Sequence, residues 1–249
     1  MPRSRECPRP LSSTPMIERR PFAELSSEDL GWLKARRHLS CMGIDDPARP
    51  VLGALRVWSD HELAPSAGFA LHAHADIEII TYVREGTVTH RDSLGNEGRI
   101  EAGSVQVVSA GTGIRHAEYN LEQEPARIFQ IWLAPTSPGS SPAWGAQPCP
   151  KAERSGSFVA IASGLDSDRD ALPIRACARV LNARLEAGAS IEYVLREPRL
   201  AYLVPSTGTV DVNGVRIYAR DGAAIKDVNL VTITAIEDAD LVMTAMLVR

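Results

Sequence analysis

The chain has 249 residues, of which 44% are hydrophobic and 23% are charged. This length allows one large or two modest domains, each with its own core, and the composition is that of an ordinary globular protein. The formal net charge of -4 provides no basic surface of the kind that a nucleic-acid backbone or an anionic membrane requires. We therefore expect no direct nucleic-acid partner and no membrane partner.

The N-terminal segment 1–15 is rich in Pro, Ser and Arg and lacks the apolar stretch of a secretory signal. We expect it to be a disordered extension, and either Met1 or Met16 could be the natural start. The four cysteines show no C-x-x-C spacing, and no apolar run approaches the ~18 residues of a membrane span. These features predict a reduced, cytoplasmic protein.

Short runs of β-branched and aromatic residues, separated by turn residues, dominate the N-terminal half. Ser26 or Ser27, followed by acidic residues, could cap a short helix that ends near Leu33. Gly95 and Asn96 tolerate positive φ and predict a hairpin turn. The expected strands are Val51 to Trp58, Ile77 to Val83, Thr87 to Arg91, Ser104 to Val108 and Arg127 to Leu133.

A segment rich in Pro, Ser and Gly, residues 135–156, predicts a linker, because proline cannot donate a hydrogen bond to a central strand ladder. A second β-rich unit follows over 157–249. Its expected strands are Arg179 to Leu185, Leu200 to Val204, Thr209 to Val212, Ala223 to Lys226, Val231 to Ile236 and Leu241 to Leu247. Aligning the Gly-Thr-Val at residue 86 with that at residue 208 indicates two copies of one domain.

A candidate metal site stands out in the first copy. His72 and His74 are separated by one residue, and His116 and Glu118 repeat that spacing. Side chains two residues apart on a strand point to the same face, so two such strands inside a barrel could enclose one ion. The second copy has no equivalent, since all 6 histidines lie at or before His116.

The surrounding residues resemble known signatures. Gly68, His72, His74, Glu78 and Gly86 are spaced nearly as in the first cupin motif, and Gly113-x-x-His116 with Asn120 is similar to the end of the second. Together with the segments at 55–57, 65–69, 77–83, 90–96 and 109–118, they resemble the pirin family, and the remainder resembles the short, quercetinase-type bacterial members. The resemblance implies an all-β bicupin with two jelly-roll-like β-barrel domains.

The pirin resemblance also implies domain boundaries and a ligand set. A metal-binding cupin domain would span 16–134, and a cupin-like domain without metal ligands would span 157–249. The ligands would be His72, His74, His116 and Glu118. Ordinary cupins take the carboxylate from the first motif, where this chain has Glu78, so Glu78 is a rival ligand. The pirin resemblance places Glu78 behind a ligand or in the cavity wall instead.

Three imidazoles and one carboxylate suit Fe(II), Mn(II), Ni(II), Cu(II) or Zn(II), and the resemblance favours Fe(II). It implies a dioxygenase that cleaves quercetin or another flavonol with O2. Glu118 could act as general base if it loosens from the metal, which would require a pKa raised by apolar surroundings. Candidate walls for such a flat aromatic substrate are Phe69, Tyr82, Val107 and Phe129, with core packing as the competing interpretation of each.

A second hypothesis is a non-enzymatic, iron-dependent regulator whose oxidation state alters a surface that binds a protein partner. The remaining residues carry less information. His61, between Asp60 and Glu62, is expected to be exposed, and His90 is expected to pair with Asp92. Trp132 and Trp144 show no helical spacing and are interpreted as packing residues.

Overall fold

A computed structural model of the chain describes residues 15–39, 50–150 and 154–247. Within these ranges the chain forms strands and one 3-10 helix, η1 (Phe22–Glu24), and no helix there is long and apolar enough to cross a membrane. Residues 1–14 of the expected extension, together with Cys7 and Cys41, lie outside the described residues. The all-β prediction is confirmed.

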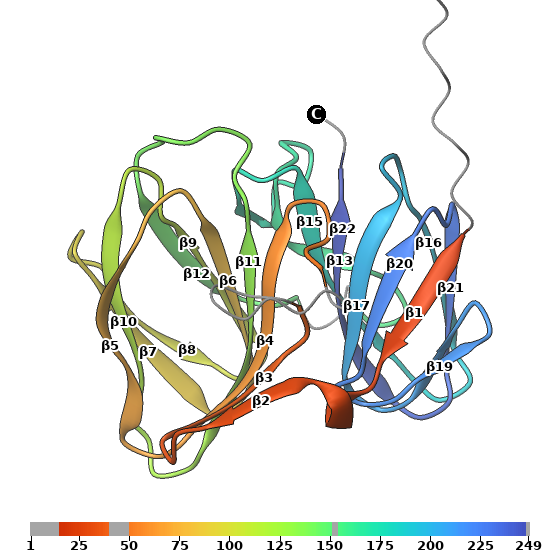
Figure 1. Cartoon of the computed structure of the whole chain (residues 1–249), viewed down its shortest axis with the longest axis horizontal. Coiled ribbons are helices and arrows are strands. Elements are labelled where there is room, and N and C mark those ends of the chain that lie inside the picture. Colours follow the sequence, from red (N-terminus) through yellow and green to blue (C-terminus); the bar gives the residue numbers. More distant parts are fainter. Residues whose placement is uncertain (1–14, 40–49, 151–153, 248–249) are drawn as a thin grey trace, which may run out of the picture.

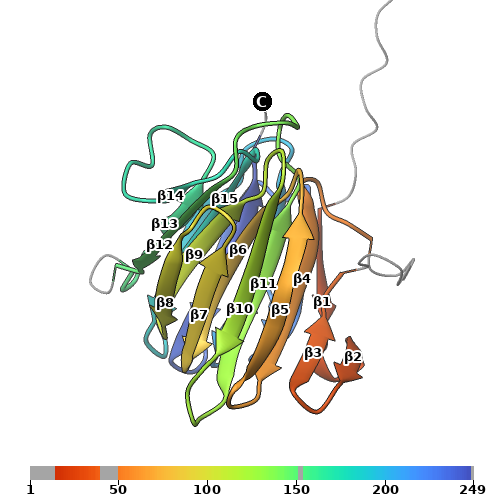
Figure 2. The same cartoon turned by 90° about the vertical axis from the view of Figure 1, so that its left-hand side faces the viewer.

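The first domain consists of two sheets, with its outer sheet lying in front of its inner sheet in Figure 2. The outer sheet contains, in spatial order, β5 (Ala67–His74), β10 (Ile114–Asn120), β7 (Thr87–Asp92) and β8 (Glu97–Glu101). The inner sheet contains β12 (Ala143–Pro148), β9 (Ser104–Ser109), β6 (Glu78–Glu85), β11 (Ala126–Leu133), β4 (Leu55–Leu63), β3 (Leu33–Arg37) and β2 (Ser26–Asp29).

The second domain repeats this arrangement of a seven-stranded and a four-stranded sheet. Its inner sheet contains β1 (Met16–Arg20), β20 (Gly222–Lys226), β17 (Leu200–Thr207), β22 (Ala239–Met246), β15 (Ala178–Leu185), β13 (Val159–Ser163) and β14 (Leu172–Pro173). Its outer sheet contains β16 (Ser190–Val194), β21 (Leu230–Ala235), β18 (Val210–Val212) and β19 (Val215–Ile217). The prediction of two jelly-roll-like domains is therefore confirmed.

The two inner sheets pack against each other, so the molecule has four layers of sheet (Figure 1). Aromatic side chains fill the centre of this contact. The Trp58 ring centroid lies 5.7 Å from that of Phe129 and 5.4 Å from that of Tyr202 in the second domain. Because the inner strands are covered on both faces, they are buried along most of their length, as in the run from Ile79 to Val83.

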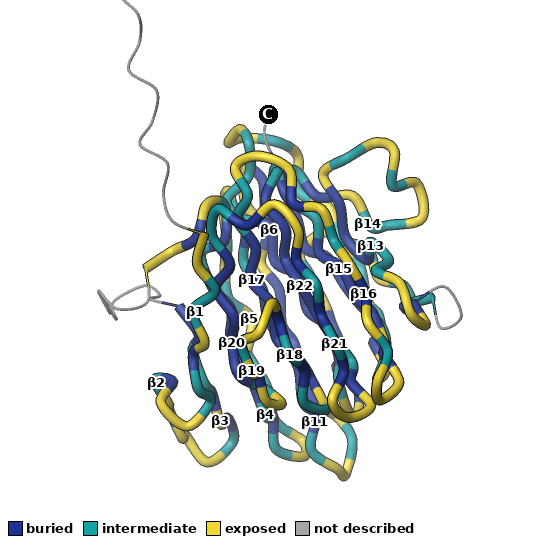
Figure 3. Tube along the Cα trace, turned by 90° about the vertical axis from the view of Figure 1, so that its right-hand side faces the viewer, coloured by how far each residue is buried: buried dark blue, intermediate teal, exposed yellow. Residues whose placement is uncertain are grey.

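The interior of the second domain is filled with aliphatic side chains. Leu181, Leu203, Ile233 and Met243 form part of one buried cluster there, each at most 1% exposed. Figure 3 views this domain from its outer side, with buried residues along the strands and exposed ones mostly in the loops. The second copy therefore has an apolar core where the first has histidines.

Most expected strands are present, but the expected helix near Ser26 is wrong. Residues Ser26–Asp29 form β2, which pairs with β3 at the edge of the inner sheet. Gly31, with φ of +79°, makes the reversal between them, and the Arg37 guanidinium forms an ion pair with Glu28. The hairpin thus satisfies backbone groups that a short isolated helix would leave unpaired.

Strands β12 and β1 lie in sheets that differ from the sequence prediction. The segment expected to be a linker contains β12, which pairs with β9 at the sheet edge, and Pro148 ends that strand, a position where proline is tolerated. Strand β1, expected in the first domain, pairs with β20 of the second. The chain therefore adds a strand to the second domain before it builds the first.

The expected exposure of His61 is wrong. His61 lies within β4, is 7% exposed and packs on Phe69 with ring centroids 5.5 Å apart. Burial, and secondarily the charge of Arg37, lower its pKa to about 3. Its neighbour Asp60 is also buried, because the guanidinium groups of Arg84 and Arg220 neutralise the Asp60 carboxylate. The polar loop expected here is an inner strand.

Candidate metal centre

Three histidines converge between the two sheets of the first domain. Strands β5 and β10 pair antiparallel, with His116 opposite His72 and Ile114 opposite His74. The ring centroid of His72 lies 4.7 Å from that of His74 and 4.6 Å from that of His116, and the last two are 5.1 Å apart. One ring nitrogen from each residue lies within 4.8 Å of the other two. This spacing allows one ion to contact all three.

The ring nitrogens are suited to a metal ion. Within the described part of the chain, His74 Nε2 and both ring nitrogens of His116 are buried without a hydrogen-bond partner. His72 Nδ1 lies 2.7 Å from the Ala70 carbonyl oxygen, which can fix the ring orientation and leave Nε2 as the ligand atom. Buried polar nitrogens without partners are costly, and a bound cation would satisfy them. The residues therefore fit a metal ion.

Burial also keeps two of the imidazoles in their ligand form. Desolvation, followed by the charge of His72, lowers the pKa of His74 to about 4. Desolvation, followed by the charges of His72 and His74, lowers the pKa of His116 to about 3. Both rings are neutral at pH 7, which is the state that coordinates metal ions.

Glu118 lies in the same interior but outside the group of three histidines. The register between β10 and β5 shifts between His116 and Glu118, and such bulges re-aim side chains next to sites. The Glu118 carboxylate is 1% exposed and accepts hydrogen bonds from Thr81 (3.2 Å), Gln130 (2.8 Å) and Gln106. Burial raises its pKa to about 7, although the three donors act in the opposite direction.

Glu78, the rival ligand, has other partners. Its carboxylate accepts hydrogen bonds from Ser109 Oγ (2.6 Å) and from the Arg175 backbone N–H (3.2 Å), and it is 1% exposed. Arg175 lies in the segment between β14 and β15, so this contact joins the first domain to the second. Glu78 also does not belong to the group of three histidines.

Three of the four candidate wall residues face away from the histidines. Tyr82, Val107 and Phe129 lie in the core between the two inner sheets. The reason is strand alternation, because Thr81 on β6 points toward Glu118 and its neighbour Tyr82 must point to the other face. Phe69 is different, with its ring centroid 6.2 Å from that of His72. Only Phe69 therefore remains a candidate wall residue of the site.

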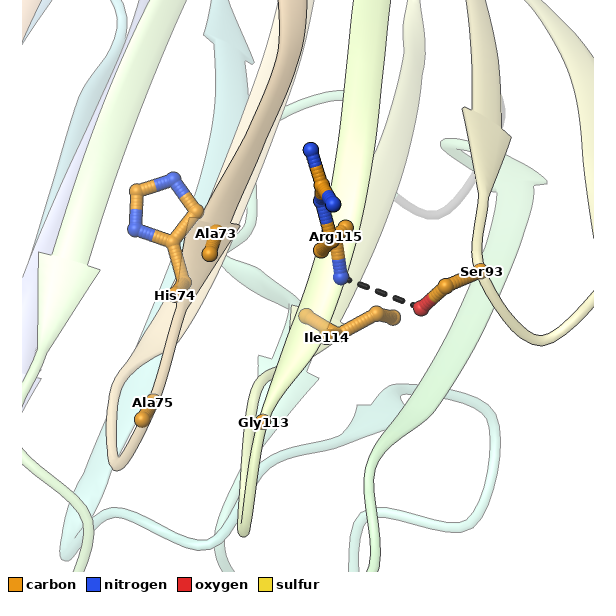
Figure 4. A pocket seen from close by; sticks show the side chains of 7 residues that line it. All are labelled: Ala73, His74, Ala75, Ser93, Gly113, Ile114 and Arg115. Carbon is orange, nitrogen blue, oxygen red and sulfur yellow. Dashed lines mark hydrogen bonds between the residues drawn. The ribbon is translucent and has the colours of Figure 1, made fainter.

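A pocket of about 370 Å³ opens beside His74 (Figure 4). Its lining combines apolar residues with three polar ones, and the Arg115 backbone N–H donates a 3.1 Å hydrogen bond to Ser93 Oγ. The lining residues are Ala73, His74, Ala75, Ser93, Gly113, Ile114 and Arg115. His74 is the one candidate ligand in this lining, and Ala73 and Arg115 alternate with the histidines along β5 and β10 on the exposed face of the outer sheet.

His90 lies beside the candidate metal centre, a position that the sequence did not indicate. Its predicted pairing with Asp92 is confirmed by a 3.1 Å contact between His90 Nε2 and Asp92 Oδ2. The His90 ring also lies 5.5 Å from the His116 ring and stacks on Trp144 at 5.0 Å. The spacing of His90 and Asp92 matches that of His72 and His74, and this could have signalled a third strand contributing to the site.

Comparison with known proteins identifies the family. The family model described as Pirin matches residues 19–133, and that described as Quercetinase C-terminal cupin domain matches residues 160–245. The pirin-like protein of Caulobacter vibrioides is 59% identical over 228 residues, which are 92% of this chain and 98% of that protein. This chain belongs to the pirin family. The prediction of a bicupin is confirmed with it.

A named relative and a solved structure, both from Escherichia coli, are also similar to this pirin. The quercetin 2,3-dioxygenase of strain K12 is 33% identical over 230 residues, covering 92% of this chain and 97% of that protein. The crystal structure of the bacterial pirin YhhW in complex with nickel(II) has a TM-score of 0.87 and 31% identity, covering 93% of this chain and 99% of that one. A solved pirin with this fold therefore binds a metal ion.

Proposed function

We propose that this pirin is a metal-dependent dioxygenase that cleaves the ring of a flavonol such as quercetin with O2. The observation that carries the proposal is the group of three imidazoles beside a pocket that His74 helps to line, since His74 and His116 have buried ring nitrogens with no partner among the described residues. The relatives named as quercetin 2,3-dioxygenases supply the substrate class. When bound, the ion would supply Lewis-acid and redox chemistry to a flavonol hydroxyl and O2.

We assign the ligands as His72, His74, His116 and Glu118, with Fe(II) as the ion in the cell. Nitrogen and oxygen donors of this kind also accept Mn, Ni, Cu and Zn, so the purified protein can carry whichever ion was supplied. Glu118, still held by its three donors, would complete the set. Phe69 would bound the substrate on the side of His72.

Glu118 has a second role in this proposal. A flavonol hydroxyl must lose its proton before the ring is cleaved, and Glu118 would accept that proton on loosening from the ion, since burial raises the pKa of the uncoordinated carboxylate to about 7. The hydrogen bonds from Thr81, Gln106 and Gln130 would hold the carboxylate in place. Both atoms of O2 would enter the ring-opened products.

Quercetin-dependent oxygen uptake by anaerobically iron-loaded protein tests this function. Metal-free protein and the His74→Ala variant are the controls, and uptake should be lost in both. Absence of uptake by protein that holds one iron per chain would contradict the dioxygenase. It would favour a regulator whose iron changes oxidation state, and a protein partner that binds only one oxidation state would then be sought.

A further inference from the structure

Three polar side chains form a row on the inner sheet opposite Glu118. In the strand register, Thr81 of β6 lies between its partners Gln106 of β9 and Gln130 of β11. All three are buried, with exposures of 0%, 0% and 7% respectively. Each donates a hydrogen bond to the Glu118 carboxylate, the one from Gln130 Nε2 spanning 2.8 Å. The row forms a cradle of donors for one carboxylate.

A glutamine can face a carboxylate in two ways. Its amide carries a donor NH2 group at one end and an acceptor oxygen at the other, so a rotated amide would present its oxygen to Glu118 and repel it. Two indoles determine the orientation in this cradle. Trp144 Nε1 donates to Gln106 Oε1 at 3.0 Å, and Trp132 Nε1 donates to Gln130 Oε1 at 3.1 Å.

The indole N–H is a donor only, so the glutamine atom that faces it must be the oxygen. We propose that Trp132 and Trp144 are positioning residues that fix the Gln130 and Gln106 amides with both NH2 groups directed at Glu118. This inference rests on the proposed role of Glu118 as the fourth ligand. Through the glutamines, the two indoles would set the orientation of that carboxylate and the affinity of the site for metal.

Strand geometry explains why these tryptophans reach the glutamines. Trp132 is two residues from Gln130 on β11 and shares its face. Trp144 lies on β12, opposite Val108, and its partner strand β9 carries Gln106 two residues away. Trp144 therefore comes from the segment expected to be a linker, which gives β12 a role in the site.

Both indoles also touch imidazoles, so the test must separate hydrogen bonding from packing. Trp132 contacts His74 with ring centroids 5.0 Å apart, and Trp144 stacks on His90 at 5.0 Å. Replacement by Phe retains an aromatic ring at each position and removes the N–H. An effect transmitted through Gln106 should disappear when Gln106 itself is removed, whereas a packing effect should persist.

The experiment measures the affinity of the full chain for Ni(II) by isothermal titration calorimetry. Trp144→Phe should weaken binding about tenfold, at the lower end of the loss typical when a group supporting a ligand is removed. In a Gln106→Leu background, Trp144→Phe should cause no further loss. Equal losses in both backgrounds, or no loss in the wild-type background, would overturn the proposal for Trp144.

Trp132→Phe and Gln130→Leu form a second mutant cycle with the same expected results. This cycle tests the proposal if circular dichroism shows that a variant of the first cycle does not fold.

Trp58→Phe is the matched control. Trp58 is 0% exposed, and its indole N–H has no hydrogen-bond partner among the described residues, so Ni(II) affinity should not change. Unchanged affinity in Glu118→Gln would refute Glu118 as a ligand, a result distinct from failure of the tryptophan cycles.

Discussion

Glu118 lies directly opposite His90 in the register between β10 and β7, and His116 lies opposite Asp92. Strand β10 therefore runs between a strand that carries two candidate ligands and a strand that carries a carboxylate-supported imidazole. Asp92 in turn accepts backbone hydrogen bonds from Leu94 (2.9 Å) and Asn96 (3.1 Å) in the hairpin. His90 and His116 are both 0% exposed, yet within the described ranges only His90 has a partner for one of its ring nitrogens.

This difference predicts opposite effects on the stability of metal-free protein. His116→Leu should raise the free energy of unfolding, because it removes two buried nitrogens that find no partner among the described residues, each costing about 1–3 kcal/mol. His90→Leu should lower it, because Asp92 then loses a hydrogen-bond partner in a buried site. Chemical denaturation in the presence of a chelator measures both, and a less stable His116→Leu protein would contradict the prediction.

The stability of metal-free protein should fall in mild acid. The pKa of His61 is lowered from 6.5 to about 3 in the folded state, so the unfolded chain binds the proton first as the pH falls. The contribution of His61 is therefore fully present above pH 6.5 and is lost toward pH 3, at about 1.4 kcal/mol per pH unit. His61→Leu should lower the slope of the unfolding free energy against pH between these values by about 1.4 kcal/mol per pH unit, leaving the smaller slope due to His74 and His116. An unchanged slope would show that His61 is not responsible.

Asp60 should be important for the contact between domains. Its carboxylate is 0% exposed and contacts Arg84, whose side chain is 7% exposed, and Arg220 of the second domain. Asp60→Asn would leave the buried Arg84 charge without its counterion and should destabilise the protein by about 3–5 kcal/mol. Glu122→Gln removes the exposed pair with Arg99 and should cost less than about 1 kcal/mol, as measured by the same denaturant titration.

The orientation of Tyr82 predicts a substitution with little effect on catalysis. Its hydroxyl donates a 3.2 Å hydrogen bond to Asp240 of the second domain, on the opposite face from Thr81. Tyr82→Phe should therefore leave kcat/KM for quercetin unchanged and lower stability by about 1 kcal/mol. Phe69→Ala should instead raise KM, because Phe69 lies beside His72. A large loss of kcat/KM in Tyr82→Phe would place this residue in the site after all.

Much of the fold could be predicted because strand spacing is local. The period of two residues placed His72 and His74 on one face, and it placed His116 with them once two strands were assumed to pair. The same period could have excluded Tyr82 as a wall residue, but only after Thr81 was known to face the site. A pattern shows which residues share a face, and it does not show which face is inward when both are buried.

The errors came from contacts between distant segments. His61 and Asp60 looked like a polar loop, and Asp60 is buried by arginines that lie 24 and 160 positions along the chain. Likewise, β1 and β12 could not be assigned to their sheets from local sequence, since their partners are β20 and β9. The contact of Trp144 with Gln106 could not be predicted from the sequence either, because the two residues are 38 positions apart.

The most direct test of the account follows the fate of O2. Iron-loaded protein would be mixed anaerobically with quercetin and then exposed to oxygen gas labelled with oxygen-18, and the products would be analysed by mass spectrometry. The account predicts ring-opened products that together contain both labelled atoms, and no product in the His74→Ala variant. Label recovered only as hydrogen peroxide or water, or intact quercetin in the presence of fully iron-loaded protein, would contradict it.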